Sequence, residues 1–256
     1  EKQKVEELIR KEFEQSNPTI KIAGSIAKET AIKDSYDLDV CIYFSCDDKD
    51  CGETLKDIYH KVKACLEKQY YVEQKPVALR LHSKASATFG VDFHIDAVPG
   101  RFIDESRCDC YLHISVGDKS YFKTNLKVHL KHIKGSGLID QIKLLKLWKV
   151  RSGLSIRTFI LELLVIEILK NSKATSLEDY LIEFWTTVKD GIFEIKVEDP
   201  ANPTGNDLSE IFDDTNKQQL KDTATRTLEL ISRRRWEDVL GPTEKNESYI
   251  APSIIT

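Results

Sequence analysis

Two carboxylates stand at the start of the most strand-like segment of the chain, and they restrict what can surround them. Residues 37–44 read DLDVCIYF, a run rich in β-branched, aromatic and apolar residues that predicts a buried strand. Alternate residues of a strand point to the same face, so Asp37 and Asp39 would lie side by side and repel each other. The pattern therefore favours a fold that brings a positive group to this face.

A third acid would make a divalent metal the natural positive group. Residues 89–100, FGVDFHIDAVPG, predict another strand, on which Asp92, His94 and Asp96 share a face. We favour Asp96, because residues 97–99 are expected to end the strand near a sheet edge, where sites open. Mg²⁺ prefers a few carboxylates together with phosphate oxygens and water. The sequence thus predicts a site for two Mg²⁺ ions, with Mn²⁺ as the alternative, held by Asp37, Asp39 and Asp96.

A Gly-Ser pair precedes the two acids. Gly24 would let backbone N–H groups approach a phosphate closely, and the Ser25 hydroxyl would add a donor. An isolated D-x-D is more often a solvated strand end or turn. Because a phosphate cradle lies shortly before it here, the combination indicates a nucleotide site.

Composition and charge are those of an ordinary folded protein. The chain has 256 residues, of which 41% are hydrophobic and 31% charged, and a net charge of −4. That charge argues against a surface built mainly to hold duplex nucleic acid. The six cysteines are scattered, which is typical of free thiols in a reducing cytoplasm. The most hydrophobic stretch, residues 159–169, is interrupted by Glu162 and Glu167 and predicts a buried helix, not a membrane span.

Hydrophobic periodicity divides the chain into two parts. The first 120 residues alternate helical and strand-like segments, with helices expected around residues 5–13 and 53–69 and strands at 77–83 and 89–100. The later residues predict long helices at 138–150, 158–170, 176–192 and 215–236, with a non-helical loop at 197–209. We expect an α+β protein with a catalytic lobe at residues 1–120 and a helical lobe at residues 121–256. The N-terminal helix could bridge both lobes.

The opening motif resembles a known signature. GSIAKETAIKDSYDLDV, residues 24–40, is similar to the Gly-Ser, spacer, Asp-x-Asp signature of nucleotidyltransferases related to DNA polymerase β. More narrowly, it resembles the 2′-5′-oligoadenylate synthetases and the bacterial cGAS/DncV-like nucleotidyltransferases, or CD-NTases. IDAVP, residues 95–99, looks like the third-carboxylate strand of that family, which again selects Asp96. The resemblance implies a mixed-sheet lobe and a helical lobe with the active site in the cleft between them.

The second half of the chain extends the resemblance. The segment at residues 143–149, KLLKLWK, looks like the helix that supplies a lysine to the donor triphosphate, which would be Lys146. LSIRTFILELL resembles the segment in which Thr158 would contact phosphate and Phe159 would stack on a base. The loop at residues 199–206, DPANPTGN, is similar to the D-P-x-x-P-x-x-N loop of the synthetase-type lobe. Alternatives remain: Lys146 could belong to a solvated helix face, and Phe159 could be plain core.

Together these motifs predict a Mg²⁺-dependent nucleotidyltransferase of the CD-NTase type. It would join NTPs, ATP among them, into a cyclic di- or trinucleotide or a short linear oligonucleotide and release pyrophosphate. Gly24, Ser25, Lys146, Thr158 and Phe159 would bind the nucleotide. The resemblance implies anti-phage signalling, with a downstream effector that reads the product and no membrane partner.

Three other functions are compatible with the same motifs. An RNA-tailing enzyme, of the CCA-adding or poly(A) type, would use the same acids but needs a basic RNA-holding surface. An oligoadenylate synthetase activated by duplex nucleic acid is disfavoured by the net charge of −4 for the same reason. A catalytically silent nucleotide-binding sensor is the alternative from another class.

Overall fold

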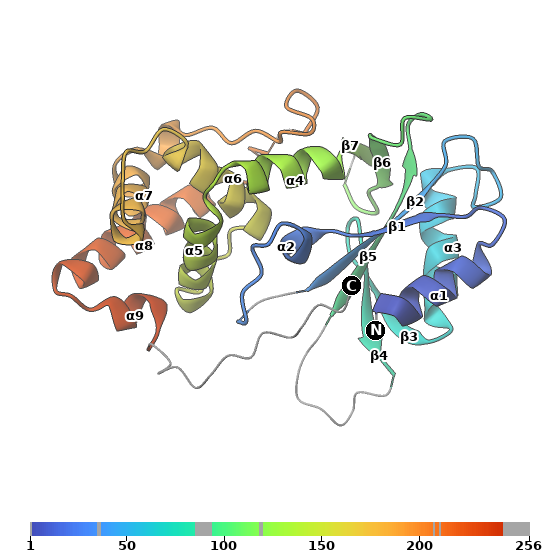
Figure 1. Ribbon diagram of the computed structural model, residues 1–256, viewed down its shortest axis with the longest axis horizontal. Helices are drawn as coiled ribbons and strands as arrows, with labels where there is room; N and C mark the ends of the chain where they lie inside the picture. Colours follow the sequence, from blue (N-terminus) through green and yellow to red (C-terminus); the bar gives the residue numbers. More distant parts are fainter. Residues whose placement is uncertain are drawn as a thin grey trace.

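A computed structural model of the chain describes residues 2–34, 37–84, 94–117, 120–206, 208–209 and 211–242. The first half holds helices α1 (Lys2–Glu12), α2 (Gly24–Ala27) and α3 (Leu55–Glu67) and strands β1 (Thr19–Ile22), β2 (Leu38–Phe44), β3 (Tyr70–Gln74), β4 (Leu79–Ser83), β5 (Ile95–Phe102), β6 (Cys110–His113) and β7 (Tyr121–Thr124). The second half holds α4 (Leu126–Gly135), α5 (Ile139–Arg151), α6 (Thr158–Leu169), α7 (Leu177–Gly191), the short 3₁₀ helix η1 (Ile192–Glu194), α8 (Asp214–Ser232) and α9 (Trp236–Leu240). Figure 1 shows the strands gathered at one end of the molecule and the later helices at the other.

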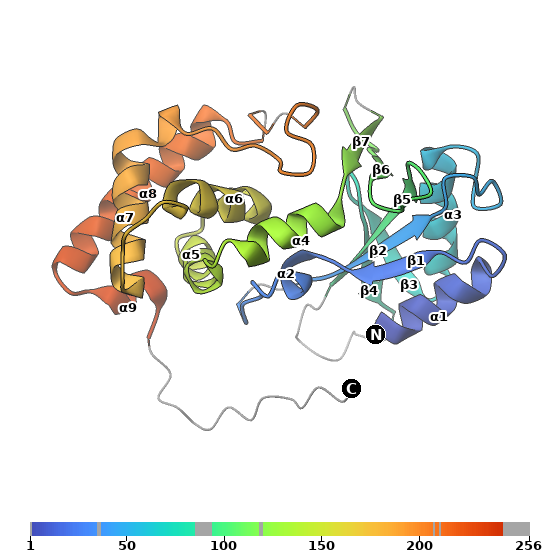
Figure 2. The same ribbon diagram turned by 45° about the horizontal axis from the view of Figure 1, so that its top comes forward.

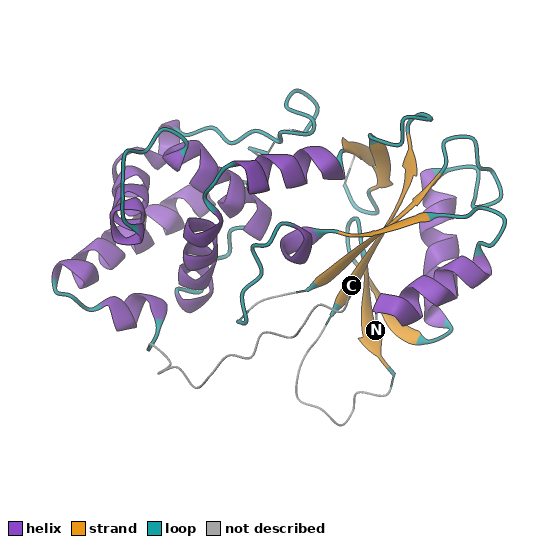
Figure 3. Cartoon of the chain, in the orientation of Figure 1, coloured by secondary structure: helices purple, strands orange, loops and turns teal. Residues whose placement is uncertain are grey.

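The strands of the described chain form one mixed sheet. Its main path runs in the order β1, β2, β5, β4, β3, while β6 pairs with β5 and β7 with β6. The pair β2 and β5 is parallel and all the others are antiparallel. The expected α+β class is therefore confirmed, and β2 and β5, the two strands that carry the predicted acids, are neighbours at the centre (Figure 3).

The two faces of this sheet have different cores because side chains alternate along each strand. Val40, Ile42 and Phe44 of β2 point to the face covered by α1 and α3 and are fully buried there. Cys41 and Tyr43 point to the opposite face, where they join a smaller cluster with Phe102 of β5 and with residues of β6. Asp39 is in phase with this second set, so the acidic face is the one that α1 and α3 leave uncovered (Figure 2).

The helical half has a core of its own. Trp148 of α5 and Trp185 of α7 are fully buried, with ring centroids 5.8 Å apart, and Phe184 packs against Trp148. The indole N–H of Trp148 donates to Thr227 Oγ1 on α8 at 2.9 Å, so this large apolar side chain also satisfies its polar atom. None of the helices in the described part of the chain combines the length and apolar character that crossing a bilayer would need.

Periodicity correctly predicts α1, α3, α5, α6, α7 and α8, but it does not predict α2, α4 or α9. The end of β5 also differs from the prediction. We expected residues 97–99 to end the strand near a sheet edge, whereas β5 continues to Phe102 and occupies a central position. Pro99 lies where one flank of β5 changes partner: β4 pairs with β5 as far as Ala97, and β6 takes over at Gly100. A proline is tolerated there because that flank needs no ladder hydrogen bond. Asp92 lies outside the described residues.

Candidate nucleotide and metal site

One row of charged side chains crosses four neighbouring strands. Asp39 of β2 is in register with Asp96 of β5, Asp96 with Arg80 of β4, and Arg80 with Glu73 of β3. Directly paired residues on adjacent strands share a face, so all four side chains project to the same side of the sheet. We call Asp39, Asp96, Arg80 and Glu73 the charged row. It brings together two of the three predicted acids, and the third, Asp37, joins them at the start of β2.

Gly24 brings a second segment against this row. Its φ of +59° is in the left-handed region, and a Cβ placed on it would come within 1.6 Å of Asp39 Oδ2. Both features demand glycine, so the Gly of the Gly-Ser pair allows the backbone at the start of α2 to approach the Asp39 carboxylate. The amide of Ala23 also donates to the Asp39 carbonyl at 2.8 Å. Ser25 follows Gly24 in α2.

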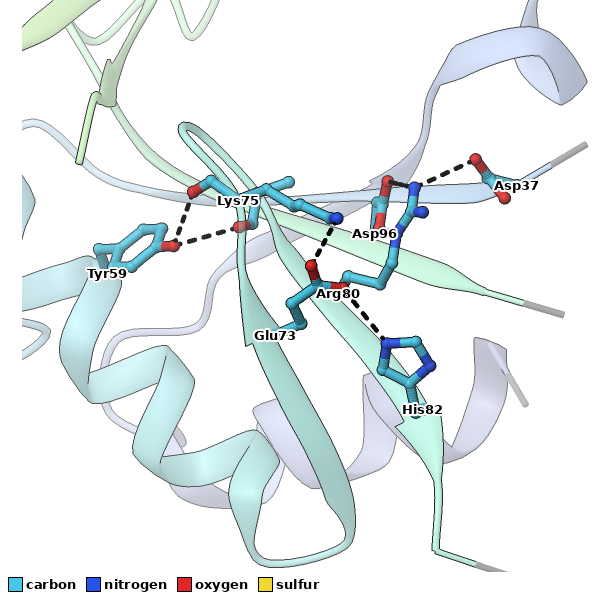
Figure 4. Close-up of polar contacts among 8 residues, drawn as sticks. Asp37, Tyr59, Glu73, Lys75, Arg80, His82 and Asp96 are labelled. Atoms are coloured by element: carbon cyan, nitrogen blue, oxygen red, sulfur yellow. Dashed lines mark hydrogen bonds and ion pairs between the residues drawn. The ribbon is translucent and has the colours of Figure 1, made fainter. Parts of the chain in front are cut away.

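Arg80 pairs with two of the three acids. Its Nε and Nη2 donate to the two oxygens of Asp96, each at 2.8 Å, and Nη2 lies 3.3 Å from Asp37 Oδ2 (Figure 4). The bidentate fork is the strong geometry for a guanidinium and a carboxylate. These hydrogen bonds raise the pKa of Arg80 above its already high usual value. In the metal-free protein, Arg80 is thus the cation that Asp96 and Asp37 require.

Asp39 is the acid whose ionised form is only partly stabilised by its neighbours. Burial, followed by the nearby charges of Asp96 and Asp37, raises the pKa of Asp39 to about 6, and the positive charges of Lys28 and Arg80 only partly offset this. A carboxyl that resists ionisation beside other carboxylates is relieved by a divalent cation. Repulsion from Asp37, which the sequence predicts, thus contributes to the raised pKa after burial and the charge of Asp96.

The donor chemistry of the three acids fits Mg²⁺ or Mn²⁺, which take carboxylate oxygens and leave room for phosphate. Within the described ranges, however, no three His, Cys, Asp or Glu side chains converge into a ready-made metal site. The hydrogen bonds of Arg80 explain this, because they direct both Asp96 oxygens and one Asp37 oxygen to the guanidinium.

A cavity of about 680 Å³ opens on the same face of the sheet. Gly24 and Lys28 line it near the acids, Tyr43 and Tyr111 line it on the sheet, and Phe159 lines it from the helical half. Its size is in the range of small-molecule sites, and its mixture of aromatic rings and few charged groups suits a ligand with a flat ring and a polar end.

Phe159 connects the cavity to a buried cation. The Lys28 ammonium lies 4.7 Å from the centroid of the Phe159 ring, and the ring of His129 lies 4.9 Å from the same ring. The half-buried Phe159 also packs against the helical core, so it serves the cavity wall and the core at once. Thr158 is the first residue of α6 and is half-buried.

Lys146 does not belong to a solvated helix face, the alternative that the sequence left open. Its side chain is buried, and its ammonium donates to the Thr30 carbonyl at 2.6 Å. Glu162 of α6, also buried, accepts from Lys28 at 2.7 Å and from the Thr30 hydroxyl at 2.6 Å. Lys146 lies 3.9 Å from the same carboxylate, and burial lowers the pKa of Lys146 to about 8. This buried cluster joins the segment after α2 to α5 and α6.

The D-P-x-x-P-x-x-N loop is fixed at both ends of its motif. Asp199 accepts from His129 Nε2 of α4 at 2.7 Å and from Asn206 Nδ2 at 2.6 Å. Asn206 Nδ2 also donates to the Lys123 carbonyl of β7 at 3.1 Å. Burial alone would raise the pKa of Asp199, but the hydrogen bonds from His129, Asn206 and the Ala201 amide hold it below its usual value. The loop is thereby held on the wall of the cavity.

Sequence reasoning missed Arg80, Lys28 and Glu162. Arg80 could have been found by parity, because VALRLHS buries Leu79 and Leu81 and so puts Arg80 on the face away from them. The position of Glu162 in an almost entirely apolar helix also carried a signal, since a buried carboxylate needs a cation or donors. The sequence does not say which lysine approaches it.

Comparison with known proteins shows which solved structures share this fold. No protein-family model matches the chain, and no curated protein matches it in sequence. Among solved structures, CdnC of Escherichia coli MS115-1 with ATP superposes with a TM-score of 0.70 at 17% identity, over 96% of this chain and 90% of that one. Vibrio cholerae DncV, a cyclic AMP-GMP synthase and prokaryotic cGAS homologue, gives 0.70 at 15% identity, over 95% and 76%.

A third neighbour belongs to the same group. The CD-NTase CdnG of Bradyrhizobium diazoefficiens, solved with GTP, has a TM-score of 0.67 at 13% identity, over 94% of this chain and 89% of that one. These neighbours thus include a CD-NTase and a cyclic AMP-GMP synthase. The chain has the CD-NTase fold, as the resemblance implied.

Replacing Asp39 with asparagine (Asp39→Asn) should stabilise the metal-free protein. Because the pKa of Asp39 is raised from 3.8 to about 6 in the folded state, the folded protein holds this proton more tightly than the unfolded chain. Its contribution to stability is complete below about pH 4 and is lost as the pH rises through about 6. We expect the free energy of unfolding near neutral pH, measured with urea in EDTA, to rise by about 2 kcal/mol in the variant.

The matched control for that experiment is Asp190→Asn, which removes an exposed carboxylate of α7 that pairs with Lys189. It should change stability by less than about 0.5 kcal/mol. The gain from Asp39→Asn should shrink at about pH 4, where the wild-type carboxyl is already protonated. A variant less stable than wild type near neutral pH would contradict the repulsion inferred for Asp39.

Replacing Glu162 with glutamine (Glu162→Gln) should destabilise the protein strongly, because it leaves Lys28 and Lys146 buried without a counter-charge. Loss of one partner of a buried pair costs about 3 kcal/mol. Glu167→Gln, on the same helix but in an exposed pair with Lys170, should cost less than about 0.5 kcal/mol. Urea denaturation of both variants measures the difference in their free energies of unfolding. A loss for Glu162→Gln as small as that for Glu167→Gln would show that the buried cluster does not stabilise the fold.

Proposed function

We propose that this chain is a Mg²⁺-dependent nucleotidyltransferase that joins NTPs into a cyclic di- or trinucleotide, or a short linear oligonucleotide, and releases pyrophosphate. The observation that carries the proposal is the juxtaposition of Asp37, Asp39 and Asp96 on one face of the sheet, in a fold shared with cyclic-nucleotide synthases. The neighbours crystallised with ATP or GTP support NTPs as the substrates.

The three acids have distinct roles in this proposal. Bound divalent ions would stabilise the attacking and leaving oxygens of an in-line displacement. Asp37 and Asp39 would hold both ions from β2, and Asp96 would hold one of them. Because Asp96 is paired directly with Asp39, it is also suitably placed to act on the hydroxyl of the acceptor nucleotide.

The nucleotide would extend from the acids into the cavity. Gly24 and Ser25 would receive the donor triphosphate, together with Lys146 and Thr158. Lys146 would have to release the Thr30 carbonyl to do so, whereas Lys28 already lines the cavity. Phe159 would stack on a base, as flat apolar rings do in nucleotide sites.

The biological role proposed here follows the resemblance to CD-NTases. The product would be a second messenger in bacterial anti-phage defence, read by a downstream effector protein. A nucleic-acid activator is not part of the proposal, because the net charge is negative. All six cysteines lie within the described residues and none is in a disulfide, which is compatible with a cytoplasmic location.

The direct test is to incubate the purified protein with all four NTPs and Mg²⁺ and to identify products by mass spectrometry. We expect pyrophosphate and a new cyclic or short linear oligonucleotide. Asp37→Asn should lower the rate at least a hundredfold, because a metal-binding carboxylate is lost from the reacting centre, by about the factor seen for other catalytic groups.

Asp190→Asn, which removes a distant exposed carboxylate, should keep the wild-type rate and controls for general effects of charge. NTP binding without any product from wild type would contradict the proposal and favour a silent nucleotide sensor. Extension of added tRNA or RNA in place of free oligonucleotide synthesis would favour the RNA-tailing alternative.

A further inference from the structure

The charged row places Arg80 between two possible carboxylate partners. Asp96 is opposite Arg80 on β5, and Glu73 is opposite Arg80 on β3. Side chains at directly paired positions have their Cβ atoms about 5 Å apart, which is well within the reach of an arginine. The same guanidinium can therefore bind either neighbour without movement of the backbone.

In this structure Arg80 binds Asp96, its partner on β5. It makes the bidentate pair with Asp96 and the longer contact with Asp37, while Glu73 accepts from Lys75 at 2.7 Å and lies 3.5 Å from His82 Nε2 (Figure 4). Glu73 is half exposed, and the hydrogen bond from Lys75 lowers its pKa. It is thus an ionised carboxylate at neutral pH, and Lys75 and His82, its partners among the described residues, are both partly exposed.

We propose that Arg80 is an exchangeable cation of the charged row, which holds Asp96 and Asp37 in the metal-free protein and turns to Glu73 when a divalent ion takes the acids. The inference rests on the proposed function, because it assumes that these acids bind metal. Arg80 is in this view a positioning residue that keeps three repelling carboxylates in place until the metal and nucleotide arrive.

Two physical arguments favour an Arg80 that exchanges partners over an Arg80 that stays paired with Asp96. Both Asp96 oxygens are engaged by Arg80, and a carboxylate bound in this bidentate way has little capacity left for a metal ion. Releasing a partly buried guanidinium without a new partner is costly, since ion pairing and hydrogen bonds are lost together. Glu73 removes that cost, because it offers a charge-assisted partner on the solvent side of the same row.

The test measures Mn²⁺ binding by isothermal titration calorimetry, without nucleotide, to wild type, Arg80→Gln, Arg80→Lys and Glu73→Gln. Arg80→Gln removes the competitor and should tighten binding about tenfold. Arg80→Lys keeps the charge but loses the fork, so it should also tighten binding, by about threefold. Glu73→Gln removes the alternative partner and should weaken binding by about threefold.

The double variant Arg80→Gln with Glu73→Gln distinguishes an exchange of Arg80 from a purely electrostatic effect of Glu73 on the metal. If Glu73 acts by receiving Arg80, then Glu73→Gln should have no effect once Arg80 is absent. If Glu73 only adds negative charge near the metal, it should weaken binding equally in both backgrounds. Glu12→Gln, which removes a carboxylate paired with Lys68 on the far side of the sheet, is the matched control and should leave Mn²⁺ affinity unchanged.

The outcomes distinguish this inference from the proposed function. Weaker binding in Arg80→Gln, unchanged binding in Arg80→Lys, or an additive double variant would overturn the exchange, even if wild type makes oligonucleotides. Tighter binding in both Arg80 variants, together with a non-additive double variant, would support the exchange even if no oligonucleotide forms. Failure of wild type and Arg80→Gln alike to bind Mn²⁺ would overturn both.

Discussion

The repulsion between Asp39 and Asp96 is the constraint on which the site depends. Their strands are parallel neighbours at the centre of the sheet, and burial, together with the nearby charges of Asp96 and Asp37, raises the pKa of Asp39 to about 6. Arg80 compensates from the adjacent strand. Two paired acids and one arginine at the centre of a sheet lower the stability of the fold. Their presence there is explained if the site binds a cation.

The same constraint reaches the helical half through the segment after α2. Gly24 lies against Asp39, and Lys28 and Thr30, a few residues later, are bound by Glu162 and Lys146 in the buried cluster. A change in the charge of the acids therefore affects the residues that pack against α5 and α6. The cavity is lined by Gly24 and Lys28 of this segment, by Tyr43 of the sheet and by Phe159 of α6, so a ligand in it would contact the sheet and the helices at once.

Much of this arrangement could be predicted from local pattern. Strand parity predicted a shared face for Asp37 and Asp39, and helical periodicity predicted α5, α6, α7 and α8 but not α4 or α9. The course of β5 beyond Pro99 could not be predicted, because the exchange of β4 for β6 along its flank is a tertiary event. Arg80, Lys28 and Glu162 were missed for a related reason: a sequence shows that a charge is buried, but pairing across strands and lobes decides what neutralises it.

A structure determined with Mn²⁺ and a non-hydrolysable NTP would show directly whether the three acids bind metal. We expect anomalous density for manganese between Asp37, Asp39 and Asp96, with the triphosphate beside Gly24 and Ser25 and the Arg80 guanidinium turned to Glu73. Manganese and nucleotide bound elsewhere, with Arg80 still paired to Asp96, would contradict it.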